Sequence, residues 1–167
     1  METETLQNGM TKWLKEAMLG FFLRGNPDNI EAPAVLKLHL GTNDTGETWL
    51  GVPDAEAQVI EFAAPTTSTV TGTTFVSNIN AIQYPTAQSD WGTIKSVGVF
   101  AYSRVPVEKP SEPKEDEDTE ESGSNEPEYT VSTVGELIYW GRLLNPISVL
   151  QGGVVAFAPN TIRIEIA

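Results

Sequence analysis

The chain has 167 residues, a length that suits one domain with its own hydrophobic core. It contains no cysteine and one histidine, which excludes disulfides and cysteine-ligated metal centres and argues against a Ser–His–Asp triad. Its 23 acidic and 10 basic residues give a net charge of −13, which disfavours binding to phosphate backbones or anionic membranes.

An amphipathic helix is predicted near the N-terminus, over about residues 5–24. Apolar residues recur there at the three- and four-residue spacing of one helix face, at Leu6, Met10, Trp13, Leu14, Ala17, Met18, Phe21 and Phe22. A glycine and an Asn-Pro pair follow, which is typical of a helix end. The polar face has too few basic residues for a membrane-surface helix, so we expect packing on a sheet or on a neighbouring subunit. The candidate subunit contacts are Trp13, Met18, Phe21 and Phe22.

Short strands are predicted over the rest of the chain. Leu36, Leu38 and Leu40 alternate with Lys37 and His39, the pattern of a strand with one buried and one solvated face. Further candidates cover residues 59–62, 69–76, 79–84, 94–102, 136–144, 154–157 and 162–166, with Gly and Pro between them. This spacing is typical of a compact antiparallel β-sandwich or a small barrel. We therefore predict a single, mainly β domain over residues 1–167 with one N-terminal helix.

An acidic insertion interrupts this domain at residues 108–128. The segment holds ten acidic and two basic residues, a net charge of −8, together with three prolines and no apolar side chain. It cannot bury enough surface to offset the entropy of ordering, so we expect a disordered or extended loop. A solvated spacer is the favoured interpretation, and an acidic arm for a basic partner or a divalent cation is the alternative.

No motif for catalysis or cofactor binding stands out. The chain lacks a Walker loop and the GxGxxG, HExxH and GxSxG patterns, and no pair of carboxylates is placed for glycoside hydrolysis. His39 is expected to be an exposed histidine on the wet face of its strand. Residues 43–47 offer oxygen ligands and a glycine turn but not the full EF-hand spacing, so an ordinary turn is favoured over calcium binding. We predict no enzyme activity, no cofactor and no metal.

Three tryptophans, Trp49, Trp91 and Trp140, could form a platform for a sugar. Trp91 lies between Asp90 and a glycine at the start of a predicted strand, where it would close one end of the core. Trp140 lies among apolar residues within a strand. A structural role is favoured for both, and a carbohydrate-binding module remains an alternative.

Several segments resemble a family of small structural proteins from the virions of tailed bacteriophages. The resemblance is carried by NAIQYPTA at residues 80–87, DWGTI at 90–94, VGVF at 97–100, LIYWGRL at 137–143 and PISV at 146–149, and by the two closing strands. Its core and turn positions are Tyr84, Pro85, Trp91, Gly92, Thr93 and Gly141. Members of this family decorate heads or form parts of tails and fibres, and the resemblance implies no catalytic residue.

The expected function is therefore that of a virion protein, assembled in the cytoplasm of a bacterial host. The first hypothesis is a decoration or cement protein that bridges coat subunits on the outer surface of the head. The alternative is a minor tail, baseplate or tail-fibre component. The expected partners are the major capsid protein or tail proteins of the same virion and further copies of the chain, with a trimer favoured. Neither nucleic acid nor membrane is expected as a direct partner.

Overall fold

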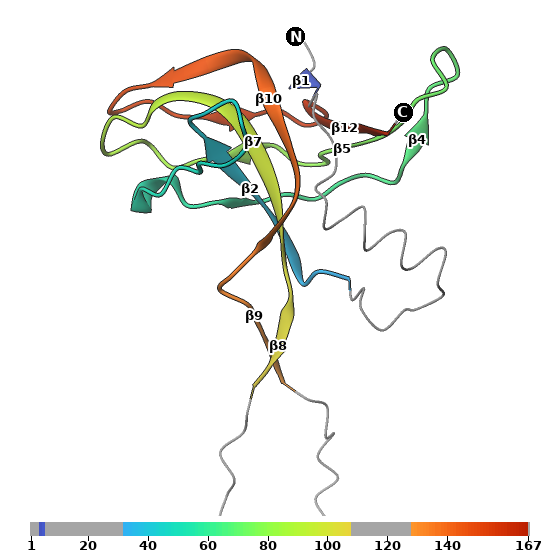
Figure 1. The fold of residues 1–167 in the computed structure, drawn as a ribbon, viewed down its shortest axis with the longest axis horizontal. Coiled ribbons are helices and arrows are strands. Elements are labelled where there is room, and N and C mark those ends of the chain that lie inside the picture. Colours follow the sequence, from blue (N-terminus) through green and yellow to red (C-terminus); the bar gives the residue numbers. More distant parts are fainter. Residues whose placement is uncertain (1–3, 6–31, 108–127, 167) are drawn as a thin grey trace, which may run out of the picture.

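The computed structural model describes residues 4–5, 32–107 and 128–166 (Figure 1). These residues form one short 3-10 turn, η2 (Pro53–Ala55), and twelve strands, which confirms a mainly β fold. The strands are β1 (Glu4–Thr5), β2 (Val35–Gly41), β3 (Gln58–Val59), β4 (Thr66–Thr67), β5 (Thr74–Ser77), β6 (Ile82–Gln83), β7 (Gly92–Tyr102), β8 (Arg104–Pro106), β9 (Tyr129–Val131), β10 (Glu136–Val149), β11 (Ala156–Phe157) and β12 (Ile162–Ile166).

The predicted N-terminal helix lies outside the described residues, apart from Thr5, which belongs to β1. The acidic insertion also lies outside them, apart from Glu128 at its end. Both therefore stay predictions, as do the domain boundaries.

The largest sheet has the strand order β10-β7-β2-β3, and all of its pairings are antiparallel. Val99 of β7 is the cross-strand neighbour of Leu38 on β2 and of Tyr139 on β10. Because paired residues share one face of a sheet, these three buried side chains lie together on its core side. The leucine alternation in the sequence is explained by this register.

A second sheet has the order β1-β12-β5-β4, in which β12 pairs antiparallel with β5 and parallel with β1. Two smaller two-stranded sheets pair β11 with β6 and β8 with β9. The sheets are open: in the described part of the chain, the edge strands β10 and β3 do not pair with the edges of the second sheet. The predicted small barrel is therefore wrong, because closure requires every edge to find a neighbour.

One hydrophobic cluster connects three of these sheets, the β8–β9 pair excepted. It contains Leu38, Leu40, Val97 and Val99 from the large sheet and Ile162 from the second, each at most 2% exposed. Further members come from β6, β10, β11 and the segments beside them, namely Ile82, Tyr84, Ala87, Trp91, Tyr139, Leu143, Val149, Val155 and Phe157. The buried Tyr84 hydroxyl donates a 2.6 Å hydrogen bond to the backbone oxygen of Leu38, so it satisfies its polar end within the core.

Asn78 is a fully buried polar side chain at the corner that follows β5. Its amide nitrogen donates to the backbone oxygens of Asn80 (2.7 Å) and Ala158 (3.0 Å). Its amide oxygen accepts a 2.9 Å hydrogen bond from the backbone N–H of Ile162. One side chain thus joins the β5–β6 corner to the turn between β11 and β12.

Candidate functional site: an aromatic groove and an exposed ribbon

A row of aromatic rings lies on the face of the large sheet opposite the core. His39 on β2 is half-buried, and its ring lies 4.2 Å from that of Phe100, centroid to centroid. Trp49 packs edge-on against Phe100, at 5.3 Å and 89°. Tyr102, two residues further along β7, stacks beside His39 at 6.4 Å with the ring planes 9° apart. Alternation along β7 therefore gives this strand a second apolar face.

A glycine on β7 makes room for one of these aromatic rings. Gly98 is the cross-strand neighbour of His39 and of Trp140. A Cβ atom at Gly98 would lie 2.3 Å from the Trp49 ring, a distance that no real Cβ adopts. Gly98 thus leaves the space into which Trp49 folds over the sheet.

The loop at residues 43–47 covers part of the same face. Its backbone oxygens are in use, because Asn43 accepts from the Ser96 hydroxyl and Asp44 accepts from the Arg142 guanidinium, both at 2.9 Å. Gly46 has a φ of 71° and lies against the Trp140 ring. No group of acidic or histidine residues in the described ranges could hold a metal ion. The loop is tied to β7 and β10 by these two hydrogen bonds, and it covers a tryptophan.

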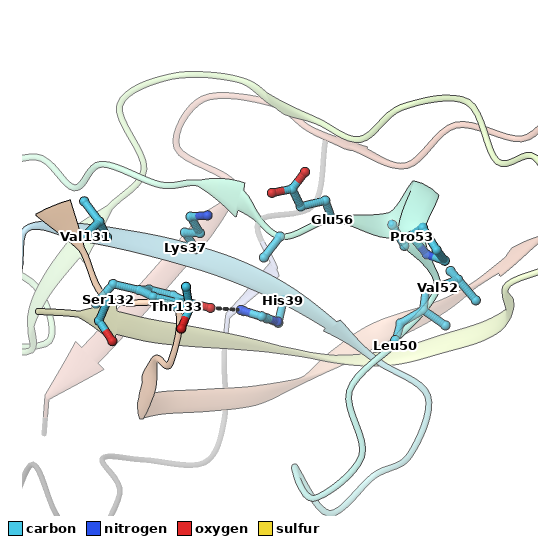
Figure 2. A pocket seen from close by; sticks show the side chains of 13 residues that line it. Lys37, His39, Leu50, Val52, Pro53, Glu56, Val131, Ser132 and Thr133 are labelled. Carbon is cyan, nitrogen blue, oxygen red and sulfur yellow. Dashed lines mark hydrogen bonds between the residues drawn. The ribbon is translucent and has the colours of Figure 1, made fainter.

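An open groove of about 590 Å³ lies beside the aromatic row (Figure 2). Lys37, His39 and Tyr102 come from β2 and β7, residues 50–57 form one side, and Val131–Thr133 form another. In Figure 2 the side chain of His39 lies between the Leu50–Pro53 segment and the Ser132–Thr133 segment. The groove therefore combines strands that are adjacent in the sheet with two loops that are distant in sequence.

His39 differs from its expected exposed state. Its Nε2 atom and the Tyr102 hydroxyl form a 2.9 Å hydrogen bond, drawn as a dashed line in Figure 2. Burial and, to a smaller extent, the charge of Lys37 lower the pKa of His39 below its ordinary value, so the imidazole is neutral at pH 7. Burial also raises the pKa of Tyr102. The strand alternation placed His39 on the correct face, but it could not show that loops cover that face.

A two-stranded ribbon, β8 with β9, extends from the end of the large sheet and points away from it (Figure 1). All six of its strand residues are exposed. Four large apolar side chains on the ribbon or next to it are 39–50% exposed: Val105, Val107, Tyr129 and Val131. This ribbon was not predicted, because its strands are short and border the acidic insertion.

The sequence-predicted residues fall in three places. Tyr84, Trp91 and Gly141 are buried. Pro85, shortly after β6, and Gly92 and Thr93, at the start of β7, are exposed. The indole N–H of Trp91 donates a 3.0 Å hydrogen bond to Asp54, which also accepts from the backbone N–H of Gln88. Both hydrogen bonds lower the pKa of Asp54, and the one from Gln88 has the larger effect. The predicted subunit contacts Trp13, Met18, Phe21 and Phe22 lie outside the described residues.

The chain matches the model of a known protein family. The family model of the Podophage GP4 fiber I protein gp80 matches residues 9–105, which is more than half of the chain. The chain belongs to this family. The gp80 fiber I family consists of phage tail-fibre proteins, which confirms the resemblance to virion structural proteins of tailed phages. No curated protein and no solved structure matches the chain.

Membership in the gp80 fiber I family makes the chain a structural component of the phage virion, in the tail fibre. It supports the tail-fibre alternative and does not support the capsid-cement role that we placed first. A fibre protein also implies other tail proteins as partners and a structural, non-enzymatic role. In the segments that the structure describes, no helix is long and apolar enough to cross a membrane.

Proposed function

We propose that the chain is a fibre subunit that joins neighbouring tail proteins by surface contacts, with the β8–β9 ribbon as an attachment element. No bond is made or broken in this role. The contacts would be formed by apolar side chains and backbone groups that the ribbon exposes on both faces.

The observation that carries this proposal is the isolation of the ribbon. A two-stranded hairpin is at best marginally stable in water, and a third strand or a packed face is needed for independent stability. Here β8 and β9 pair with each other through three residue pairs, and the described residues provide no further strand beside them. A partner surface that covers the exposed valines and Tyr129 would supply the missing packing.

The chemistry of the ribbon indicates an apolar contact. Of its six strand residues, Arg104 alone is charged, although the whole chain carries −13. Two acidic chains repel each other least where the surfaces in contact carry no charge. We include contacts between copies in the proposal, with a trimer favoured, and we assign the predicted apolar stripe with Trp13 and Phe21 to the same assembly.

Copy number in purified virions tests the location. Quantitative mass spectrometry with the major coat protein as the standard should give a few copies per particle, in threes or sixes. A ratio close to that of the coat protein would instead indicate a head decoration protein and would contradict the fibre proposal. Absence from the particle would contradict any virion role.

Ribbon variants test the attachment element. Replacing two exposed side chains in Val105→Ser/Tyr129→Ser should leave the urea midpoint of the isolated chain nearly unchanged and should reduce incorporation into particles. The matched control is Val70→Ser, because Val70 is 91% exposed on the β4–β5 loop. Equal incorporation of the ribbon variant and the control would show that the ribbon is not an attachment element.

A further inference from the structure

A second exposed apolar surface lies at the end of the large sheet opposite the ribbon. It consists of Leu150 and Val154, which are 64% and 47% exposed on either side of a turn. The turn follows the point where Val149 pairs with Gly92 at the start of β7, whereas β8 follows the other end of that strand. The eleven residues of β7, at about 3.3 Å each, separate the two surfaces by about 30 Å. In Figure 1 the ribbon lies at the bottom, and β10 runs from near the ribbon to the upper left.

Hydrogen bonds hold this turn in one conformation. The N–H of Gly152 donates to the oxygen of Ala87 at 2.8 Å, and the N–H of Ala87 donates to the oxygen of Gly153 at 2.9 Å. The N–H of Gln151 donates a 2.7 Å hydrogen bond to the carboxylate of Asp90. The two apolar side chains are therefore exposed on a backbone that is already fixed, so a partner that covers them pays little entropy for ordering the turn.

The few charges on the two surfaces are complementary. The strands of the ribbon contain one charged residue, the exposed Arg104. Beside the turn are two carboxylates, those of Asp54 and Asp90, which accept backbone N–H groups of the segments that hold the turn. Otherwise no charged residue occurs at 62–89 or 143–162, the two stretches that meet there. An uncharged apolar patch with a cation beside it thus matches an uncharged apolar patch with anions beside it.

The acidic insertion determines which surfaces of two copies can meet. Val107 and Glu128 border it and are joined by a 2.8 Å backbone hydrogen bond, so the insertion starts and ends at the tip of the ribbon. A contact between two ribbons would bring two segments of charge −8 together, which is strongly repulsive. A contact between a ribbon and a turn avoids this, because the insertion of the second copy is attached at the opposite end of its sheet.

We propose that the ribbon of one copy docks on the turn of a second copy at residues 150–154, so that the copies associate head to tail. This inference rests on the proposed function and names the partner of the ribbon. Val105 and Tyr129 cover the two apolar side chains of the turn, and Arg104 lies beside the carboxylates. Such a contact joins two different surfaces of the same chain, so repetition gives an open fibre or a closed ring such as the favoured trimer.

Complementation between two variants tests this contact. The ribbon variant Val105→Ser/Tyr129→Ser and the turn variant Leu150→Ser/Val154→Ser each lack one of the two surfaces. In analytical ultracentrifugation of the full chain over a concentration series, the unmodified chain should form assemblies and each variant alone should remain monomeric. An equimolar mixture of the variants should form dimers and nothing larger, because each variant keeps the surface that the other lacks. A monomeric unmodified chain at every concentration, or a mixture that contains only monomers, would overturn the inference.

A control separates this inference from the role of the ribbon in attachment. The matched variant is Val59→Ser/Val70→Ser, because both valines are exposed, by 54% and 91%, and belong to neither surface. It should assemble like the unmodified chain, and all three variants should keep its urea midpoint. Assembly of the turn variant equal to that of the control would overturn the head-to-tail contact, even if the ribbon variant still fails to enter particles. Normal incorporation of the ribbon variant into particles would instead contradict the proposed function.

Discussion

Asn78 provides the sharpest test of how the fold is held together. Its side chain makes three hydrogen bonds at zero exposure, two donated to backbone oxygens and one accepted from the N–H of Ile162. The change Asn78→Asp keeps the shape and the acceptor but loses both donors. It also places a carboxylate against the oxygens of Asn80 and Ala158.

The magnitude follows from those contacts. Each buried hydrogen bond contributes about 1 kcal/mol, and a buried group left without its partner costs about 1–3 kcal/mol. Asn78→Ala loses all three bonds and leaves the Ile162 N–H unpaired, so we expect a loss of about 3–5 kcal/mol. Asn78→Asp should cost at least as much at pH 7, because the new charge is buried against acceptors. Since domains of this kind are stable by about 5–15 kcal/mol, either variant should lose a substantial fraction of the free energy of unfolding.

The assay is urea unfolding followed by tryptophan fluorescence and by circular dichroism, with coincidence of the two as a check on two-state behaviour. Asn78→Asp should recover part of its stability when the pH is lowered, because protonation removes the charge and restores one donor. The control is Asn145→Asp, an exposed change on β10 that should be nearly neutral. A loss below about 1 kcal/mol for Asn78→Ala would refute the role assigned to this corner.

Three further outcomes are expected in the same unfolding assay. Gly98→Ala should destabilise by about 1–3 kcal/mol through overpacking against Trp49, and a smaller penalty in a Trp49→Leu background would identify the clash, whereas an equal penalty would not. Asp54→Ala should lower the urea midpoint by removing the acceptor of the Trp91 indole, and an unchanged midpoint would contradict this. Because burial lowers the pKa of His39, its contribution is present at neutral pH and is lost as the pH falls below about 6.5 toward the folded-state value. His39→Gln should therefore flatten the pH dependence by at most about 1.4 kcal/mol per pH unit, and a slope equal to that of the unmodified chain would contradict the assignment.

Much of the fold was predictable because strand alternation is a local signal. Leu36, Leu38 and Leu40 indicated which face of β2 is buried, and the dense apolar run at 94–102 indicated a central strand, which is β7. The long β10 extends to Val149, beyond the predicted end at residue 144, because its bent course past Pro146 resumes pairing with β7 at Ile147. Whether sheets close into a barrel depends on their edges, and a single sequence carries no signal for that.

The candidate surfaces were less accessible to sequence reasoning. Lys37 and His39 marked a wet strand face, but the groove exists only because residues 50–57 and 131–133 come together there. Asn78 belongs to no motif, and its importance comes from contacts about 80 residues away. Long-range pairing of this kind leaves no periodicity in the chain, whereas the Tyr84 and Trp91 positions were visible through their aromatic-Pro and Trp-Gly context.

The two candidate surfaces are physically linked through one strand. β7 supplies Val97 and Val99 to the core, then Tyr102 to the groove, and continues through Ser103 into β8. The return strand is held to it by a 2.9 Å hydrogen bond from the N–H of Ser132 to the oxygen of Ser103. A partner that changed the angle of the ribbon would therefore move the side of the groove formed by residues 131–133 relative to β2. Contacts at the ribbon and the shape of the groove therefore depend on the same return strand.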